Sequence, residues 1–100
     1  MASIDPLNQA SRPRLRPGIR LRHDRSSGQL VLLAPERGLA LNASAGEIIQ
    51  RCTGELTVEE IATELMHIHR DLSLPELEVQ VMHFLRRLMD RGLLTMEMTR

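Results

Sequence analysis

Apolar and polar positions divide the chain into a strand-like first half and a helical second half. Residues 18–24 alternate apolar side chains with arginines, and residues 29–34 are almost continuously apolar. Residues 39–42 follow the turn Pro35-Glu36-Arg37-Gly38, which has proline first and glycine last. Short loops between these three strand-like segments predict an antiparallel meander.

Three helices are predicted after this meander, each opening with the pattern Ser/Thr-x-x-Glu at Ser44, Thr57 or Ser73. In such a capping box the hydroxyl accepts a hydrogen bond from the third backbone N–H, and the carboxylate accepts one from the cap's own N–H. Apolar side chains at helical spacing follow each box. The predicted helices cover residues 45–52, 58–69 and 74–91.

Strands first and helices after predict an α+β fold, a three-stranded antiparallel meander followed by a three-helix bundle. Residues 1–17 contain several prolines and few large apolar side chains, so we expect a disordered or loosely held arm. Residues 18–94 then form the one domain that 100 residues can build. Residues 95–100 are expected to fray.

Composition disfavours several classes of function. Seven arginines face three acids up to Asn42 and six face ten acids after it, which gives a net charge of zero. The single aromatic residue, Phe84, argues against binding by base stacking. One cysteine permits no internal disulfide, and no apolar run reaches the ~20 residues that span a bilayer. We therefore expect a soluble cytoplasmic protein.

The residues that could carry chemistry are few. His67 and His69 are two positions apart, whereas metal-binding pairs on a helix are three or four apart, so we expect no metal. Cys52 lies on the inner stripe of its helix, which favours a small buried hydrophobe over a nucleophile. The chain has no glycine-rich phosphate loop and no nucleophile elbow. The sequence predicts neither a cofactor nor an enzyme.

Two surface features have alternative interpretations. The six arginines within residues 12–25 indicate a solvated arm and the outward face of a strand. Nucleic-acid binding is the more specific alternative. Val79, Met82 and Met89 lie off the main apolar stripe of the third helix. They fill gaps in the core or form an adaptable surface for a partner.

The last predicted strand, residues 39–42, is the expected functional site. A strand at the edge of a sheet offers N–H and C=O groups to an extended peptide. Peptide binding by strand addition gains affinity from main-chain hydrogen bonds and selectivity from pockets for alternate side chains. The same edge could pair two copies, so a homodimer formed by edge pairing or swapping is also expected.

The sequence resembles the PqqD family of pyrroloquinoline quinone (PQQ) biosynthesis. The likeness extends over residues 16–94, and its most specific part is the spacing of Pro35-Glu36 and Leu41-Asn42. Many members have glycine where Arg37 stands and aspartate where Thr53 stands, differences that leave the fold inference untouched. Further matching motifs are Ser44-Ala45, Ile48-Ile49, Cys52-Thr53-Gly54 and Val58-Glu59-Glu60-Ile61-Ala62.

This resemblance implies a winged-helix-like module without catalytic activity. Such a peptide chaperone binds the ribosomally made precursor PqqA and presents it to the radical S-adenosylmethionine (SAM) enzyme PqqE, which crosslinks Glu and Tyr side chains of the peptide. In related modules the leader segment adds as a strand beside the third strand, against the third helix. The implied peptide-binding residues are Arg37, Gly38, Leu39, Ala40, Leu41 and Asn42 at the edge and Leu77, Gln80, Val81 and Phe84 in the groove wall.

The alternative function is a winged-helix DNA-binding regulator. Its third helix would enter the major groove and would use Arg86, Arg87 and Arg91. However, that helix opens with Glu76 and Glu78, at the end that would meet the bases. A metal-dependent enzyme is a third possibility, which the histidine spacing disfavours. Peptide binding is the preferred interpretation.

Overall fold

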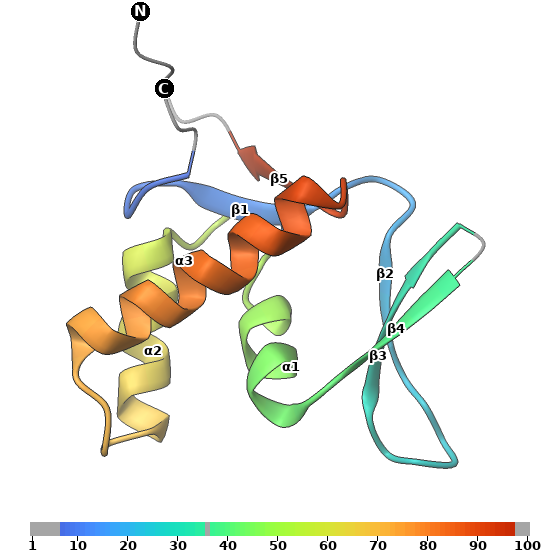
Figure 1. Ribbon diagram of the computed structural model, residues 1–100, viewed down its shortest axis with the longest axis horizontal. Coiled ribbons are helices and arrows are strands. Elements are labelled where there is room, and N and C mark those ends of the chain that lie inside the picture. The colour runs from blue at the N-terminus through green and yellow to red at the C-terminus, as the bar shows by residue number, and fades with distance from the viewer. Residues whose placement is uncertain (1–6, 36, 98–100) are drawn as a thin grey trace, which may run out of the picture.

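The computed structural model describes residues 7–35 and 37–97. A three-stranded sheet lies to one side of α1 and α2 lies to the other, while α3 runs from beside α2 past the end of α1 towards the sheet (Figure 1). A pair of strands crosses the end of this arrangement. The elements are β1 (Arg12–Leu15), β2 (Arg20–His23), β3 (Leu30–Ala34), β4 (Arg37–Leu41), α1 (Ala43–Gln50), α2 (Val58–Ile68), α3 (Leu74–Asp90) and β5 (Leu94–Glu97).

The three-stranded sheet has the order β2-β3-β4, with both pairs antiparallel. This confirms the predicted meander. Leu21, Leu32 and Leu39 stand in one cross-strand row, and Leu32 is only 1% exposed. Because alternate side chains face opposite sides of a strand, this row marks the inner face of the sheet.

The start of each helix is fixed by a side-chain cap. The capping boxes predicted at Thr57 and Ser73 are confirmed, with Glu60 and Glu76 as their carboxylate partners. The box predicted at Ser44 is wrong. Asn42 caps α1 instead, and its Oδ1 accepts a hydrogen bond from the Ala45 N–H at 2.8 Å.

Asn42 can cap α1 because it stands where the chain leaves β4. Its backbone is still extended, with φ −74° and ψ 174°, so its side chain lies over the first helical turn. Ser44 already belongs to the helix and cannot serve as the cap. A four-residue pattern in the sequence does not distinguish these two polar residues.

The two ends of the described chain pair with each other. β1 and β5 are antiparallel, and Arg14 Nη1 lies 2.8 Å from Glu97 Oε1. Pro13 is fully buried and Leu7 is 2% exposed. The expectations of a loosely held arm over residues 1–17 and of fraying from residue 95 are therefore wrong for residues 7–17 and 95–97. The remaining terminal residues of those two predictions lie outside the described part.

The sequence pattern hid this pairing because its two strands are about 80 residues apart. Locally, Arg12–Leu15 contains a proline and two arginines, which are typical of an exposed arm. Backbone hydrogen bonds nevertheless attach the segment to the start of α2, from Val58 N–H to Ser11 O and from Glu59 N–H to Gln9 O. The domain therefore includes residues that precede the predicted boundary at residue 18.

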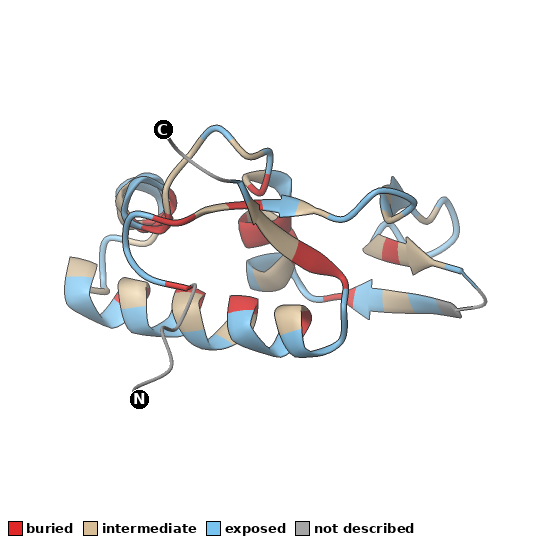
Figure 2. Cartoon of the chain, turned by 90° about the horizontal axis from the view of Figure 1, so that it is seen from above, coloured by how far each residue is buried: buried red, intermediate tan, exposed pale blue. Residues whose placement is uncertain are grey.

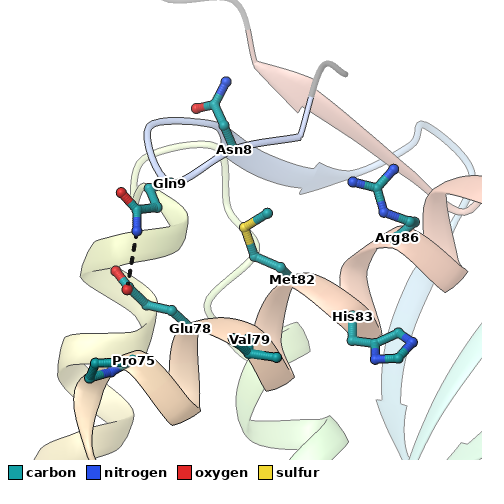
Figure 3. Close-up of a pocket in the computed structure, with 8 residues that line it drawn as sticks. All are labelled: Asn8, Gln9, Pro75, Glu78, Val79, Met82, His83 and Arg86. Carbon is teal, nitrogen blue, oxygen red and sulfur yellow. Dashed lines mark hydrogen bonds between the residues drawn. The ribbon is translucent and has the colours of Figure 1, made fainter. Parts of the chain in front are cut away.

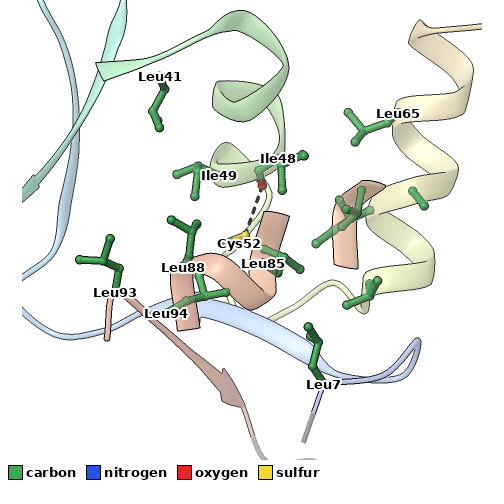
Figure 4. Close-up of a cluster of buried hydrophobic side chains, with 14 of the residues drawn as sticks. Leu7, Leu41, Ile48, Ile49, Cys52, Leu65, Leu85, Leu88, Leu93 and Leu94 are labelled. Carbon is green, nitrogen blue, oxygen red and sulfur yellow. Dashed lines mark hydrogen bonds between the residues drawn. The ribbon is translucent and has the colours of Figure 1, made fainter. Parts of the chain in front are cut away.

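The hydrophobic core fills the space between the helices and the inner face of the sheet. Buried residues lie on the sides of α1 and α3 that face other elements (Figure 2). Leu41 from β4, Ile49 from α1 and Leu88 from α3 gather in the cluster drawn in Figure 4. Among the described helices, none has the length and apolar character needed to cross a membrane.

Candidate functional site

The hydrogen-bond pattern of the sheet shows which backbone groups of β4 face outward. Just beyond the ends of β2 and β3, Asp24 N–H donates to Gln29 O at 2.8 Å, so the register continued from His23 and Leu30 makes residues 24 and 29 a hydrogen-bonded pair. Such pairs alternate along an antiparallel ladder. Residues 31 and 33 of β3 therefore bond to β2, and residues 30, 32 and 34 bond to β4.

The register carries this alternation onto β4. Arg37, Leu39 and Leu41 oppose the β3 residues whose hydrogen bonds point to β4, so their N–H and C=O groups complete the ladder. The N–H and C=O groups of Gly38 and Ala40 consequently point away from β3. In the described part of the chain, no strand pairs with this outer edge. The edge can accept an additional strand.

A groove runs between this open edge and α3. Its central hollow has a volume of about 210 Å³. A hollow of about 220 Å³ continues it beside Gly38 and Leu93, and one of about 390 Å³ continues it beside Ser44 and Gln80. The central hollow is lined by Leu39, Ala40, Leu41, Asn42, Ala45, Phe84, Arg87, Leu88 and Arg91.

The groove contains most, but not all, of the residues expected from the sequence. Gly38 to Asn42 and the helix residues Gln80 and Phe84 line its three hollows. The backbone of Arg37 extends the same strand. Leu77 and Val81 line none of the three hollows and lie in the core, where they are 4% and 0% exposed.

Leu77 and Val81 were expected in the groove because a single apolar stripe of α3 packs against the core along part of its length and lines the groove along another part. Helical spacing identifies the side of α3 that packs inward, but it does not show where along the helix the sheet ends. The groove residues missed by that reasoning include Ala45, His83, Arg87, Leu88 and Arg91. Arg87 and Arg91 are one helical turn apart, which is the one signal that could have identified them.

Arg87 and Phe84 form a contact at the wall of the groove. The guanidinium carbon of Arg87 lies 5.9 Å from the centroid of the Phe84 ring, a distance typical of a cation–π contact. Phe84 is half-buried and packs against the hydrophobic core. It thus offers an apolar surface to the groove while the core holds it in place.

A larger hollow, of about 760 Å³, lies on the opposite flank of α3. Gln9 Nε2 donates to Glu78 Oε1 at 3.2 Å across its wall, and Val79 is 66% exposed (Figure 3). Met82 and Met89 are both half-buried and pack against the core, and Met82 also lines this hollow. The neighbouring β1 is bonded by β5 on one edge and by a bridge from Arg14 to Thr53 on the other.

The groups that the sequence analysis considered for chemistry, Cys52, His67 and His69, lie outside the groove. Burial raises the pKa of the Cys52 thiol to about 12, and its Sγ lies 3.3 Å from Ile48 O. The interpretation of Cys52 as a buried hydrophobe is confirmed. His69 Nε2 lies 2.7 Å from Glu47 Oε1. In the ranges described, no three His, Cys, Asp or Glu side chains converge as metal ligands would.

Comparison with known proteins identifies the family. The family model for coenzyme PQQ synthesis protein D (PqqD) matches residues 29–94. The chain belongs to the PqqD family. A PqqA binding protein of Xanthomonas oryzae pv. oryzae (strain KACC10331 / KXO85) is 37% identical over 91 residues, which cover 91% of this chain and 98% of that protein.

Two solved structures share the fold. One is the solution NMR structure of the PqqD truncation of Methylobacterium extorquens PqqCD, described as a functional, stand-alone recognition element (RRE) for ribosomally synthesized and post-translationally modified peptides (RiPPs). It has a TM-score of 0.77 and 31% identity, and the match covers 89% of this chain and 94% of that one. The crystal structure of PqqD from Xanthomonas campestris has a TM-score of 0.51 and 36% identity, with 86% and 94% covered.

These comparisons confirm the resemblance and the α+β fold expected from the sequence. They also favour a peptide-binding role in PQQ biosynthesis over the DNA-binding alternative. The likeness to a winged helix stays a prediction.

Proposed function

We propose that this protein binds the precursor peptide PqqA by strand addition to β4. The observation that carries the proposal is the outward direction of the Gly38 and Ala40 backbone groups, beside a groove lined in part by apolar side chains. An extended peptide would pair with these groups and would place every second side chain in the groove. Membership of the PqqD family and a relative named PqqA binding protein support PqqA as the occupant.

The proposed site revises the set expected from the sequence. It keeps the backbone of Arg37 to Asn42 for the added strand, and it keeps Gln80 and Phe84 in the wall. It adds Ala45 and Leu88, which line the central hollow, and omits the buried Leu77 and Val81. Apolar side chains of the peptide would fill this hollow between the sheet and α3, where they leave water.

The protein would act without catalysis and would present the bound peptide to the radical SAM enzyme PqqE in the cytoplasm. Strand addition occupies one edge of the protein and leaves the rest of an extended peptide accessible to an enzyme. The buried Cys52 thiol, whose pKa is raised, is a poor nucleophile, which supports a binding role. A second copy could pair with the same edge, so peptide should shift any homodimer towards monomers.

Two proline substitutions in β4 test this function. Ala40→Pro removes an N–H that points outward, so we expect normal folding and an affinity for synthetic PqqA at least about tenfold lower. Leu39→Pro removes an N–H that bonds to β3, so it should lower the free energy of unfolding by about 1–3 kcal/mol. Calorimetric titration measures binding, and thermal unfolding measures stability.

Backbone amide shifts of the labelled protein locate the peptide directly. On titration with synthetic PqqA, the largest changes are expected from residues 38–42 and from the facing part of α3. If folded Ala40→Pro bound the peptide as tightly as the unaltered protein, the peptide would lie elsewhere. Shifts confined to the larger hollow at Val79 and Met82 would lead to the same conclusion.

A further inference from the structure

The ionisable side chains that line the groove are all of basic residue types. Within the described residues, its three hollows are lined by Arg87, Arg91 and His83 and by no Asp or Glu. The chain as a whole has equal numbers of basic and acidic residues. The positive charge of the groove is therefore a local feature. A cleft lined by one sign of charge concentrates ligands of the opposite sign.

Both arginines are available to a ligand. Among the residues described, neither Arg87 nor Arg91 forms an ion pair with a carboxylate, although Arg14 and Arg51 do. Both side chains are exposed, Arg87 on α3 and Arg91 at the cap of its C-terminal end. Their guanidinium groups can each donate two parallel hydrogen bonds to one carboxylate.

The spacing of these arginines matches an extended peptide. Four residues along a helix correspond to a rise of about 6 Å. Two residues along a strand, whose side chains point to the same face, correspond to about 6.6 Å. A strand added to β4 in line with α3 could therefore bring alternate side chains to Arg87 and Arg91.

We propose that the groove selects an acidic segment of its peptide, in which two carboxylates on alternate residues pair with Arg87 and Arg91. The inference rests on the proposed function, because it assumes that the peptide adds to β4. Apolar contacts in the hollows would then hold the peptide in place. The arginines would fix its register and discriminate against neutral segments.

A charge-removal experiment tests the inference with synthetic PqqA as the probe. The variant Arg87→Gln/Arg91→Gln should bind the peptide about tenfold more weakly at low salt, and its affinity should depend much less on the salt concentration. Arg86→Gln is the matched control, since Arg86 belongs to the same helix but lines the hollow on the other flank. It should change the affinity less than about twofold. Thermal unfolding of each variant checks the fold.

Amide versions of the peptide, with Asp→Asn and Glu→Gln changes at alternate positions, complete the test. One pair of amide substitutions in the peptide should weaken its binding to the unaltered protein about tenfold. The same peptide should bind Arg87→Gln/Arg91→Gln about as well as the unaltered peptide does, because the peptide and protein substitutions remove the same contacts. Fully additive losses, or an equal loss from Arg86→Gln, would overturn the inference. A scrambled peptide of equal charge that bound as tightly would also overturn it. If Ala40→Pro lost binding while Arg87→Gln/Arg91→Gln kept it, the result would support strand addition and refute only the charge selection.

Discussion

The two hollows on either side of α3 differ in more than size. The larger one has a volume of about 760 Å³, is lined by α3 and the segment around Asn8, and lies beside a strand that is bonded on both edges. The central hollow of the groove measures only about 210 Å³ but adjoins the open edge of β4. For an extended ligand, the available backbone groups matter more than the volume, because they supply directional hydrogen bonds along the whole length of the peptide.

A pair of substitutions on the two flanks of α3 gives the largest expected contrast. Phe84→Ala removes an apolar wall of the groove and should weaken binding of PqqA about 10- to 100-fold, as expected for an aromatic contact residue. Val79→Ala alters the most exposed apolar residue of the larger hollow and should leave the affinity unchanged. Calorimetric titration compares both with the unaltered protein. A loss from Val79→Ala as large as that from Phe84→Ala would reverse the assignment of the two flanks.

A smaller effect is expected at the junction of β4 and α1, which lines two hollows of the groove. Asn42→Ala removes the cap of α1 and should lower the free energy of unfolding by about 1 kcal/mol. Ser44→Ala, two residues away, should cost less than about 0.5 kcal/mol, because Ser44 caps nothing. Chemical denaturation measures both variants. Equal losses would mean that Asn42 contributes no more than an ordinary surface residue.

The smallest effect concerns pH and the starts of α2 and α3, where capping boxes lie outside the groove. Backbone hydrogen bonds from Thr57 and Ser73 hold the pKa of Glu60 and Glu76 below the ordinary value of 4.5. Groups with a lowered pKa stabilise the fold above their unfolded pKa and lose this contribution as the pH falls through the folded pKa. The melting temperature should therefore fall below about pH 4.5, and less steeply in Glu60→Gln/Glu76→Gln.

Thermal unfolding between pH 3 and pH 7 measures that difference. The comparison also separates stability from binding, because these carboxylates lie at helix starts and do not line the groove. Parallel melting curves for the variant and the unaltered protein would show that the boxes add no pH-dependent stability.

Local patterns in the sequence predicted most of the fold. The caps at Thr57 and Ser73 and the order of the meander follow from neighbouring residues, and the structure confirms both. The pairing of β1 with β5 joins segments at opposite ends of the chain, so no local pattern contains it. From local sequence alone, Pro13 indicates an exposed arm. Its burial can be explained only once the pairing of β1 with β5 is known.

The candidate site was predictable along β4 but only partly along α3. The edge position of β4 follows from its place as the last strand of a meander. Which turn of α3 meets that edge depends on the crossing of helix and sheet, which the apolar stripe does not specify. For this reason Val81 was expected in the groove and lies in the core, while Arg91 was missed.

The pairing of β1 with β5 also determines how the protein can be tethered to others. Arg12 stands opposite Glu97, so the chain enters and leaves the described domain side by side. Segments that precede β1 and follow β5 therefore start from the same side of the described domain, away from the open edge of β4. One architecture could therefore serve as an independent unit or as an appended module, as in the Methylobacterium extorquens PqqCD chain from which a related domain was truncated.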